Sequence, residues 1–163
     1  MTLQDLLPHA ENVARQLKAR GETVAVAESA AGGLISAALL AVPGASAYYR
    51  GGAVVYTRAV LASLTRVPEE RLSTMRGATE DYALFAARTV REQFGVHWAV
   101  GESGAAGPTG NRYGDAAGHV CLAVSGARER TMTIETGSGD RIANMYAFAA
   151  AALKLLADSL SNA

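Results

Sequence analysis

The sequence is poor in the residues that build metal and redox centres. It has one cysteine, Cys121, three histidines and only two lysines among 163 residues. No disulfide can form within the chain, which fits a reducing cytoplasm. No histidine or cysteine pair has metal-binding spacing, and no dinucleotide or Walker pattern occurs, so we expect no metal and no cofactor. Cys121 lies in an apolar run, so we expect a buried strand residue rather than a nucleophile.

Charge excess and long hydrophobic segments are also lacking. The formal net charge is zero, which argues against a nucleic-acid partner, because binders of the phosphate backbone carry a basic excess. No apolar run reaches membrane-spanning length, and the N-terminus does not resemble a signal peptide, so we expect no membrane partner. Half of the residues are hydrophobic and 18% are charged. This composition predicts one globular domain over residues 1–163, located in the cytoplasm.

Strand and helix patterns alternate along the chain. Apolar residues at helical spacing predict a first helix that stops at Gly21, and further helices begin after Thr79 and Asp140 as N-caps. Short apolar runs predict strands at 23–27, 51–57, 96–101, 118–124 and 131–135, with the last two forming a hairpin. This order predicts an α/β layered fold with helices on both faces of a mixed sheet.

The stretch 23–40 contains the first candidate for a functional site. A short strand is followed by a polar corner at Ser29, two glycines (Gly32 and Gly33) and an apolar helix. The first free N–H groups of a helix at such a corner attract an anion or a developing oxyanion. Ser29 is therefore either a nucleophile raised above the sheet or a helix N-cap, in which case the glycines only permit close packing.

Other polar groups follow the predicted strands, at the sheet edge where α/β proteins bind ligands. The segment 102–115 is a long glycine-rich loop, and a loop of that length is typical of a functional site. Arg141 begins a helix, where a positive charge is unfavourable unless it faces an anion or forms an ion pair with Asp140 or Glu135. His119 follows the loop and is the one histidine kept as a candidate acid or base.

Five segments together are similar to one known family. They are residues 27–33 (Ala-Glu-Ser-Ala-Ala-Gly-Gly), 43–47, 50–57, 103–108 and 138–141. In this order and spacing they resemble the CinA C-terminal domain family, whose active members are nicotinamide-nucleotide amidohydrolases. The resemblance runs over nearly the whole chain. It implies a three-layer α/β/α sandwich with a mixed, mostly parallel sheet, a homo-oligomer, and a small-molecule pyridine nucleotide as partner.

The resemblance also implies an activity and a set of site residues. The activity is hydrolysis of the carboxamide of nicotinamide mononucleotide to nicotinate mononucleotide and ammonia. By position, Ser29 would be the nucleophile, Tyr56 would handle protons, and Arg141 would hold the phosphate. Ser46 would be a nearby hydroxyl, and Ser103 and Gly104 would line the pocket. From the polar segments themselves we further expect Gly32, Gly33, Arg58, Asn111 and Arg112 at the substrate.

One departure from the family pattern affects the expected mechanism. Active members resemble Tyr-Ser-Asn-x-x-Lys after the second strand, and that lysine helps to activate the serine. The corresponding stretch here is Tyr-Thr-Arg-Ala-Val-Leu, so Leu61 occupies the lysine position. The segment 111–115 and His119 likewise replace a glycine-rich run and a threonine. A leucine cannot accept a proton, and a serine without a base is a poor nucleophile.

Three hypotheses follow from this departure. In the first hypothesis, another residue replaces the lysine as the base that activates Ser29. This base is either Tyr56, with a pKa lowered by Arg58 or Arg112, or His119 together with Asp115. Alternatively, the protein retains a nucleotide-shaped pocket without the amidase activity and acts as a binding or regulatory protein, or on another substrate. The third hypothesis is an oligomeric scaffold without a ligand, which the donor-rich loops disfavour.

Overall fold

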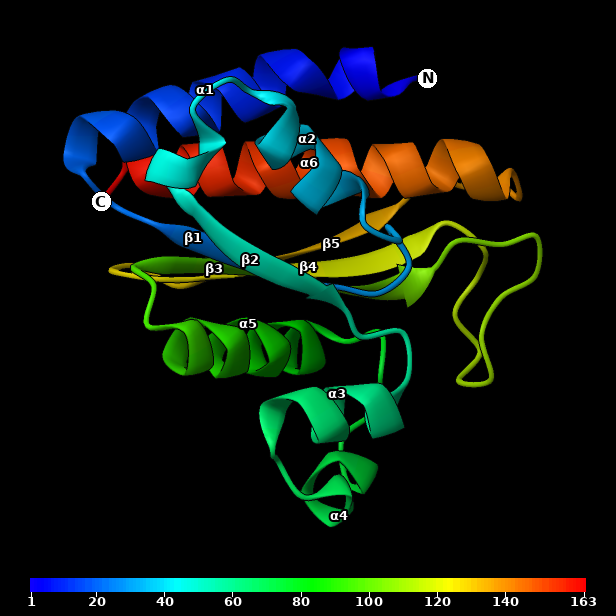
Figure 1. The fold of residues 1–163 in the computed structure, drawn as a ribbon. Coiled ribbons are helices and arrows are strands. Elements are labelled where there is room, and N and C mark those ends of the chain that lie inside the picture. Colours follow the sequence, from blue (N-terminus) through cyan, green and yellow to red (C-terminus); the bar gives the residue numbers. More distant parts are fainter.

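The computed structural model describes residues 1–163 and contains five strands and six α-helices (Figure 1). The strands are β1 (Val24–Glu28), β2 (Tyr49–Val54), β3 (Trp98–Ala105), β4 (His119–Ser125) and β5 (Arg130–Glu135). The helices are α1 (Leu3–Arg20), α2 (Leu34–Ala41), α3 (Arg58–Thr65), α4 (Glu69–Ser73), α5 (Glu80–Phe94) and α6 (Arg141–Ser161). A 3-10 turn (Ala45–Ala47) precedes β2.

The strands form one sheet in the order β2-β1-β3-β4-β5. β1 pairs in parallel with both β2 and β3, whereas β4 is antiparallel to β3 and to β5. Four strands therefore share one direction and only β4 opposes them. The mixed, mostly parallel sheet is confirmed, and the late hairpin is formed by β4 and β5.

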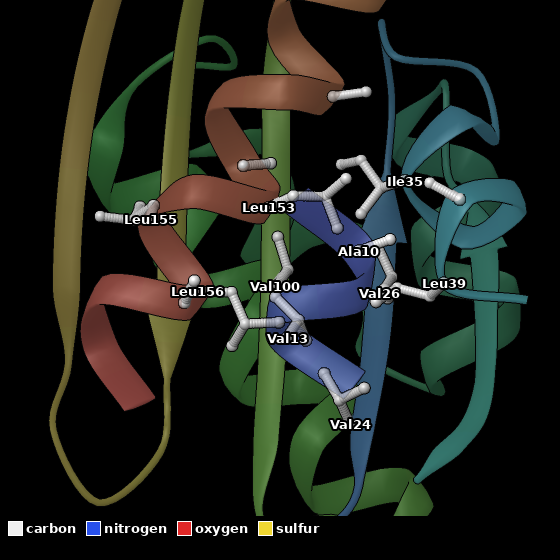
Figure 2. Close-up of a cluster of buried hydrophobic side chains, with 14 of the residues drawn as sticks. Ala10, Val13, Val24, Val26, Ile35, Leu39, Val100, Leu153, Leu155 and Leu156 are labelled. Carbon is white, nitrogen blue, oxygen red and sulfur yellow. The ribbon is translucent and has the colours of Figure 1, made fainter. Parts of the chain in front are cut away.

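Helices cover both faces of this sheet (Figure 1). α1, α2 and α6 lie on one face, and α5 lies on the other, with α3 and α4 beyond it. The larger core contains 28 buried apolar residues from α1, α2, α6 and the sheet, and Figure 2 shows part of it, including Val26, Val100 and Leu153. A second core of 14 residues lies between the sheet and α5. The layered α/β architecture is confirmed.

The predicted helix boundaries follow local capping chemistry. α1 ends at Gly21, which adopts a left-handed φ of 65° that a side chain would disfavour. The Thr79 hydroxyl accepts a hydrogen bond from the Tyr82 N–H at 3.2 Å, and the Asp140 carboxylate accepts one from the Ala143 N–H at 3.0 Å. Both residues are the N-caps that the sequence predicts.

The predicted loop 102–115 is wrong at its start, because β3 continues to Ala105. Pairing with β4 extends from Ala99 opposite Ser125 to Ala105 opposite His119, so the ladder supplies partners for these backbone groups. Ser103 and Gly104 are therefore strand residues. A Cβ at Gly104 would lie 2.5 Å from the His119 carbonyl oxygen, so this register requires glycine there. None of the helices combines the length and apolarity needed to cross a bilayer.

Candidate functional site

A cavity of about 700 Å³ opens beside the carboxyl ends of β1 and β3. This volume lies within the range of roughly 300–1,000 Å³ that is usual for small-molecule sites. The sheet contributes one side of the cavity, and the other sides come from the start of α3, from α4 and from the segment after β3. Seven predicted site residues line it: Ser29, Tyr56, Arg58, Ser103, Gly104, Asn111 and Arg112.

Five predicted site residues do not line this cavity. Ser46 is exposed in the 3-10 turn, where its carbonyl accepts a hydrogen bond from Arg50. Arg141 lies at the margin: its guanidinium donates to the Gly107 carbonyl at 2.5 Å and to the Tyr56 hydroxyl at 3.4 Å. The others are Gly32, Gly33 and His119. Their predicted roles at a substrate remain predictions.

The backbone corner after β1 is not an open anion site, contrary to the expectation from sequence. Two buried carboxylates already occupy its N–H groups. Glu102 accepts from the N–H groups of residues 29, 30 and 31 at 2.8, 3.2 and 2.8 Å. Glu28 accepts from those of residues 33, 35 and 36 at 2.9, 3.0 and 2.8 Å. Glu28, rather than Ser29, therefore caps α2, and no backbone donor of this turn remains for an oxyanion.

Burial raises the pKa of Glu102 to about 7, and the nearby charge of Glu28 acts in the same direction. The three backbone hydrogen bonds oppose this shift, because they stabilise the ionised form. Glu102 is 2% exposed, so its charge is held almost entirely by the peptide groups of the turn. The turn that presents Ser29 is therefore bound by a β3 carboxyl group whose pKa is raised to about 7.

Two serines line the cavity, and the hydroxyl of each can still donate a hydrogen bond. The Ser29 hydroxyl makes no hydrogen bond within the protein, and no general base lies within hydrogen-bond reach of it. The Ser103 oxygen accepts a hydrogen bond from the Ala78 N–H at 3.1 Å, which leaves its own proton free. The pair can therefore supply one nucleophilic oxygen and one donor to a ligand carbonyl.

The sequence predicts that Arg58 or Arg112 lowers the pKa of Tyr56, but in the structure both arginines contact a different tyrosine. Arg58 and Arg112 both donate to the hydroxyl of Tyr113, at 2.6 and 2.9 Å, whereas the Tyr56 hydroxyl contacts only Arg141. The sequence analysis included Tyr113 in the glycine-rich segment 102–115 but gave it no role. The signal that could have identified it is an aromatic residue next to an arginine in the loop after β3.

His119 does not line the cavity, and both of its ring nitrogens have partners within the protein. Nε2 contacts the Ala78 carbonyl at 2.9 Å, and Nδ1 contacts the Glu135 carboxylate. Burial lowers the pKa of His119, but these two contacts and the charges of Glu135 and Asp115 outweigh it and raise the pKa overall. Because both nitrogens face acceptors, the ring has no lone pair directed at Ser29. This geometry favours a structural role and disfavours His119 as the substitute base.

Leu61 is fully buried in the second core. It belongs to the same apolar cluster as Val55, Leu72 and Tyr82, and it does not line the cavity. The position that the family resemblance assigns to lysine therefore presents no basic group to the cavity. The structure contains no cluster of three or more acidic, histidine or cysteine side chains arranged to hold a metal ion.

Comparison with known proteins identifies relatives along almost the whole chain. The model of the CinA C-terminal domain matches residues 7–160. A CinA-like protein of Chlorobium phaeobacteroides is 38% identical over 152 residues, covering 90% of this chain and 36% of the relative. A CinA-like protein of Anaeromyxobacter sp. is 38% identical over 156 residues, covering 94% of this chain and 38% of the relative. The chain thus spans just over a third of the length of these relatives.

Solved structures agree with this relationship. A competence-damaged protein (CinA) superfamily protein from Klebsiella pneumoniae superposes with a TM-score of 0.89 at 27% identity, covering 100% of both chains. The competence/damage inducible protein CihA from Agrobacterium tumefaciens gives a TM-score of 0.87 at 28% identity, covering 96% of each chain. The matched model spans nearly every residue from the first helix to the last, and the chain belongs to the CinA C-terminal domain family.

Proposed function

We propose that this protein is an amidohydrolase that deamidates nicotinamide mononucleotide, with Ser29 as the nucleophile. One observation carries the proposal: the Ser29 hydroxyl has no partner within the protein and faces a cavity of nucleotide size. The same cavity contains the Ser103 hydroxyl and two arginines, Arg58 and Arg112. These groups suit a ligand that carries both a carboxamide and a negative charge.

The reaction needs two steps. Ser29 Oγ attacks the carboxamide carbon and loses its proton, the C–N bond breaks, and the amide nitrogen leaves as ammonia after gaining a proton. Water then hydrolyses the acyl-enzyme ester to nicotinate mononucleotide and restores the serine. We assign stabilisation of the carbonyl oxygen to the free proton of Ser103, since the backbone donors of the turn are occupied by Glu28 and Glu102. Tyr56 is the proposed proton carrier at the cavity wall.

A second candidate function is binding of a pyridine nucleotide, or of a related anionic ligand, without deamidation. The observation that favours it is the absence of a base in reach of Ser29, together with the full burial of Leu61. Removing one member of a catalytic unit commonly lowers a rate by several powers of ten. In this case the cavity would serve a regulatory role.

Ammonia release from nicotinamide mononucleotide separates the two functions. The amidohydrolase hypothesis predicts release by the wild type and its loss in Ser29→Ala. Thermal stabilisation by the nucleotide without any ammonia release would instead support the binding function. Absence of both release and stabilisation would reject both functions.

A further inference from the structure

One wall of the cavity carries two arginines that have no carboxylate partner. Arg58 is the first residue of α3, and Arg112 comes from the segment after β3. Their guanidinium groups converge on the Tyr113 hydroxyl, and Arg58 also donates to the Met75 carbonyl. Neither arginine takes part in an ion pair, so their positive charges are available to a ligand.

The other charged groups around Tyr113 leave this wall positive. Arg76 lies over the Tyr113 ring at 5.3 Å and is paired with Asp115 at 2.6 Å, so these two charges offset each other. Glu69 of α4 lines the cavity but forms no ion pair with either free arginine. From α5, the wall receives only the neutral phenol of Tyr82.

The pKa of Tyr113 indicates that the electrostatic potential at its hydroxyl is positive. Burial raises the pKa of its phenol, but hydrogen bonds from Arg112 and the Gly77 backbone, and the charges of Arg58 and Arg112, outweigh this effect. The pKa is lowered overall, which means that the surroundings stabilise a negative oxygen. An oxygen of a bound anion in the same place would be stabilised for the same reason.

The position of Arg58 adds a second argument. The N-terminus of a helix is electropositive, so an arginine at the first helical residue is unfavourable unless an anion balances it. Thr57, Arg58 and Ala59 all line the cavity, so the start of α3 faces the same space as the two guanidinium groups. Helix dipole and side-chain charge therefore favour an anion at one place.

We propose that Arg58, Arg112 and the Tyr113 hydroxyl form a subsite for the phosphate group of the ligand. Arginine pairs bind phosphate oxygens with directed, charge-assisted hydrogen bonds. The family resemblance implies that Arg141 holds the phosphate, but that side chain is engaged with the Gly107 carbonyl and Tyr56 and lies outside the cavity lining. The identity of the ligand as nicotinamide mononucleotide rests on the proposed function, whereas the subsite itself does not.

Calorimetry with three probes tests the subsite: nicotinamide mononucleotide, nicotinamide riboside, which lacks the phosphate, and inorganic phosphate. In the wild type, the mononucleotide should bind at least tenfold more tightly than the riboside, and phosphate should compete with it. The double variant Arg58→Gln/Arg112→Gln should weaken mononucleotide binding at least tenfold and leave riboside binding unchanged. Arg128→Gln/Arg130→Gln removes the same charge away from the cavity and should bind like the wild type.

The results separate this proposal from the proposed function. Phosphate-dependent binding that needs Arg58 and Arg112 but gives no ammonia supports the subsite and rejects the deamidase. Wild-type mononucleotide affinity in the double variant, or a loss of affinity only in Arg141→Gln, overturns the subsite even if ammonia is released. Failure of the wild type to bind either mononucleotide or phosphate also overturns it. If the double variant does not fold, Arg112→Gln alone, at an exposed position, should still weaken mononucleotide binding but not riboside binding.

Discussion

Glu28 and Glu102 extend from adjacent strands, directly after the paired residues Ala27 and Gly101, into the same turn. Between them they accept hydrogen bonds from six backbone N–H groups of residues 29–36. The turn that carries Ser29 is therefore held in place by the protein's own carboxylates. Its geometry does not depend on a bound anion.

Replacement of Glu102 by alanine should destabilise the protein by about 3 kcal/mol. Three buried N–H groups would lose their acceptor, and a single unsatisfied buried donor costs about 1–3 kcal/mol. Denaturant-induced unfolding at neutral pH measures the effect. The control is Glu11→Ala, an exposed carboxylate on α1, for which a smaller loss is expected. An equal loss in both variants would contradict the role given to Glu102.

Stability should depend on pH through Glu102. Its folded pKa of about 7 lies above the ordinary value of 4.5, so the folded state binds this proton more tightly than the unfolded state. The free energy of unfolding should therefore fall as the pH rises from about 4.5 to about 7. Glu102→Gln should lack this component, and the difference between the two curves isolates it from other titrating groups. If the wild type and Glu102→Gln show the same dependence of stability on pH, the proposed contribution of Glu102 is wrong.

Lysine at position 61, where the family resemblance implies one, should not by itself confer activity. Leu61 is buried in the core beside α5, so Leu61→Lys places an amine in an apolar site and should cost about 3–4 kcal/mol. Leu61→Met should cost less than about 1.5 kcal/mol, because the volume is kept. Unfolding measurements and ammonia assays on both variants check this. A stable Leu61→Lys variant with faster release would show that the side chain reaches the cavity.

His119 should act as a structural cation. Because its pKa is raised, the stability that it contributes is fully present below the unfolded pKa near 6.5 and is lost as the pH rises through the folded pKa. His119→Ala should therefore lose more stability at pH 6 than at pH 9, but should retain any Ser29-dependent ammonia release. NMR titration of the ring and an ammonia assay test the two parts. Loss of release in a folded variant would restore His119 as a candidate base.

Ser103→Ala should affect both the fold and the site. The Ala78 N–H would lose its acceptor, at a cost of about 1–3 kcal/mol, and Ala78 already has a left-handed φ of 54°. If Ser103 stabilises the carbonyl oxygen, kcat should fall by about 10²-fold while KM changes little. Ser73→Ala, which also lines the cavity, serves as the control. A change confined to KM would assign Ser103 to binding alone.

Much of the fold could be predicted from local patterns. Periodicity identified α1, the apolar runs identified the five strands, and capping chemistry located Gly21, Thr79 and Asp140. These features are determined by residues that lie close together in the sequence. The chain order of strands and helices was then enough to predict a layered fold with a mixed sheet.

The candidate site was less predictable because it depends on contacts between distant segments. Glu102 reaches back more than seventy residues to the Ser29 turn, and Tyr113 receives Arg58 across fifty-five residues. Neither contact leaves a periodic signal. Ser29, Ser103, Arg58 and Arg112 could be named from the polar loops, but which of them meet one another could not.

The two sides of the cavity are connected to the sheet in different ways. The Ser29 turn is fastened to β1 and β3 through Glu28 and Glu102, whereas the arginine wall is built on α3 and on the segment after β3, outside the sheet (Figure 1). Neither Arg58 nor Arg112 donates a hydrogen bond to the Ser29 turn, and their partners are Tyr113 and the Met75 carbonyl. The charge of the arginine wall can therefore be changed without removing any of the hydrogen bonds that position the backbone of Ser29.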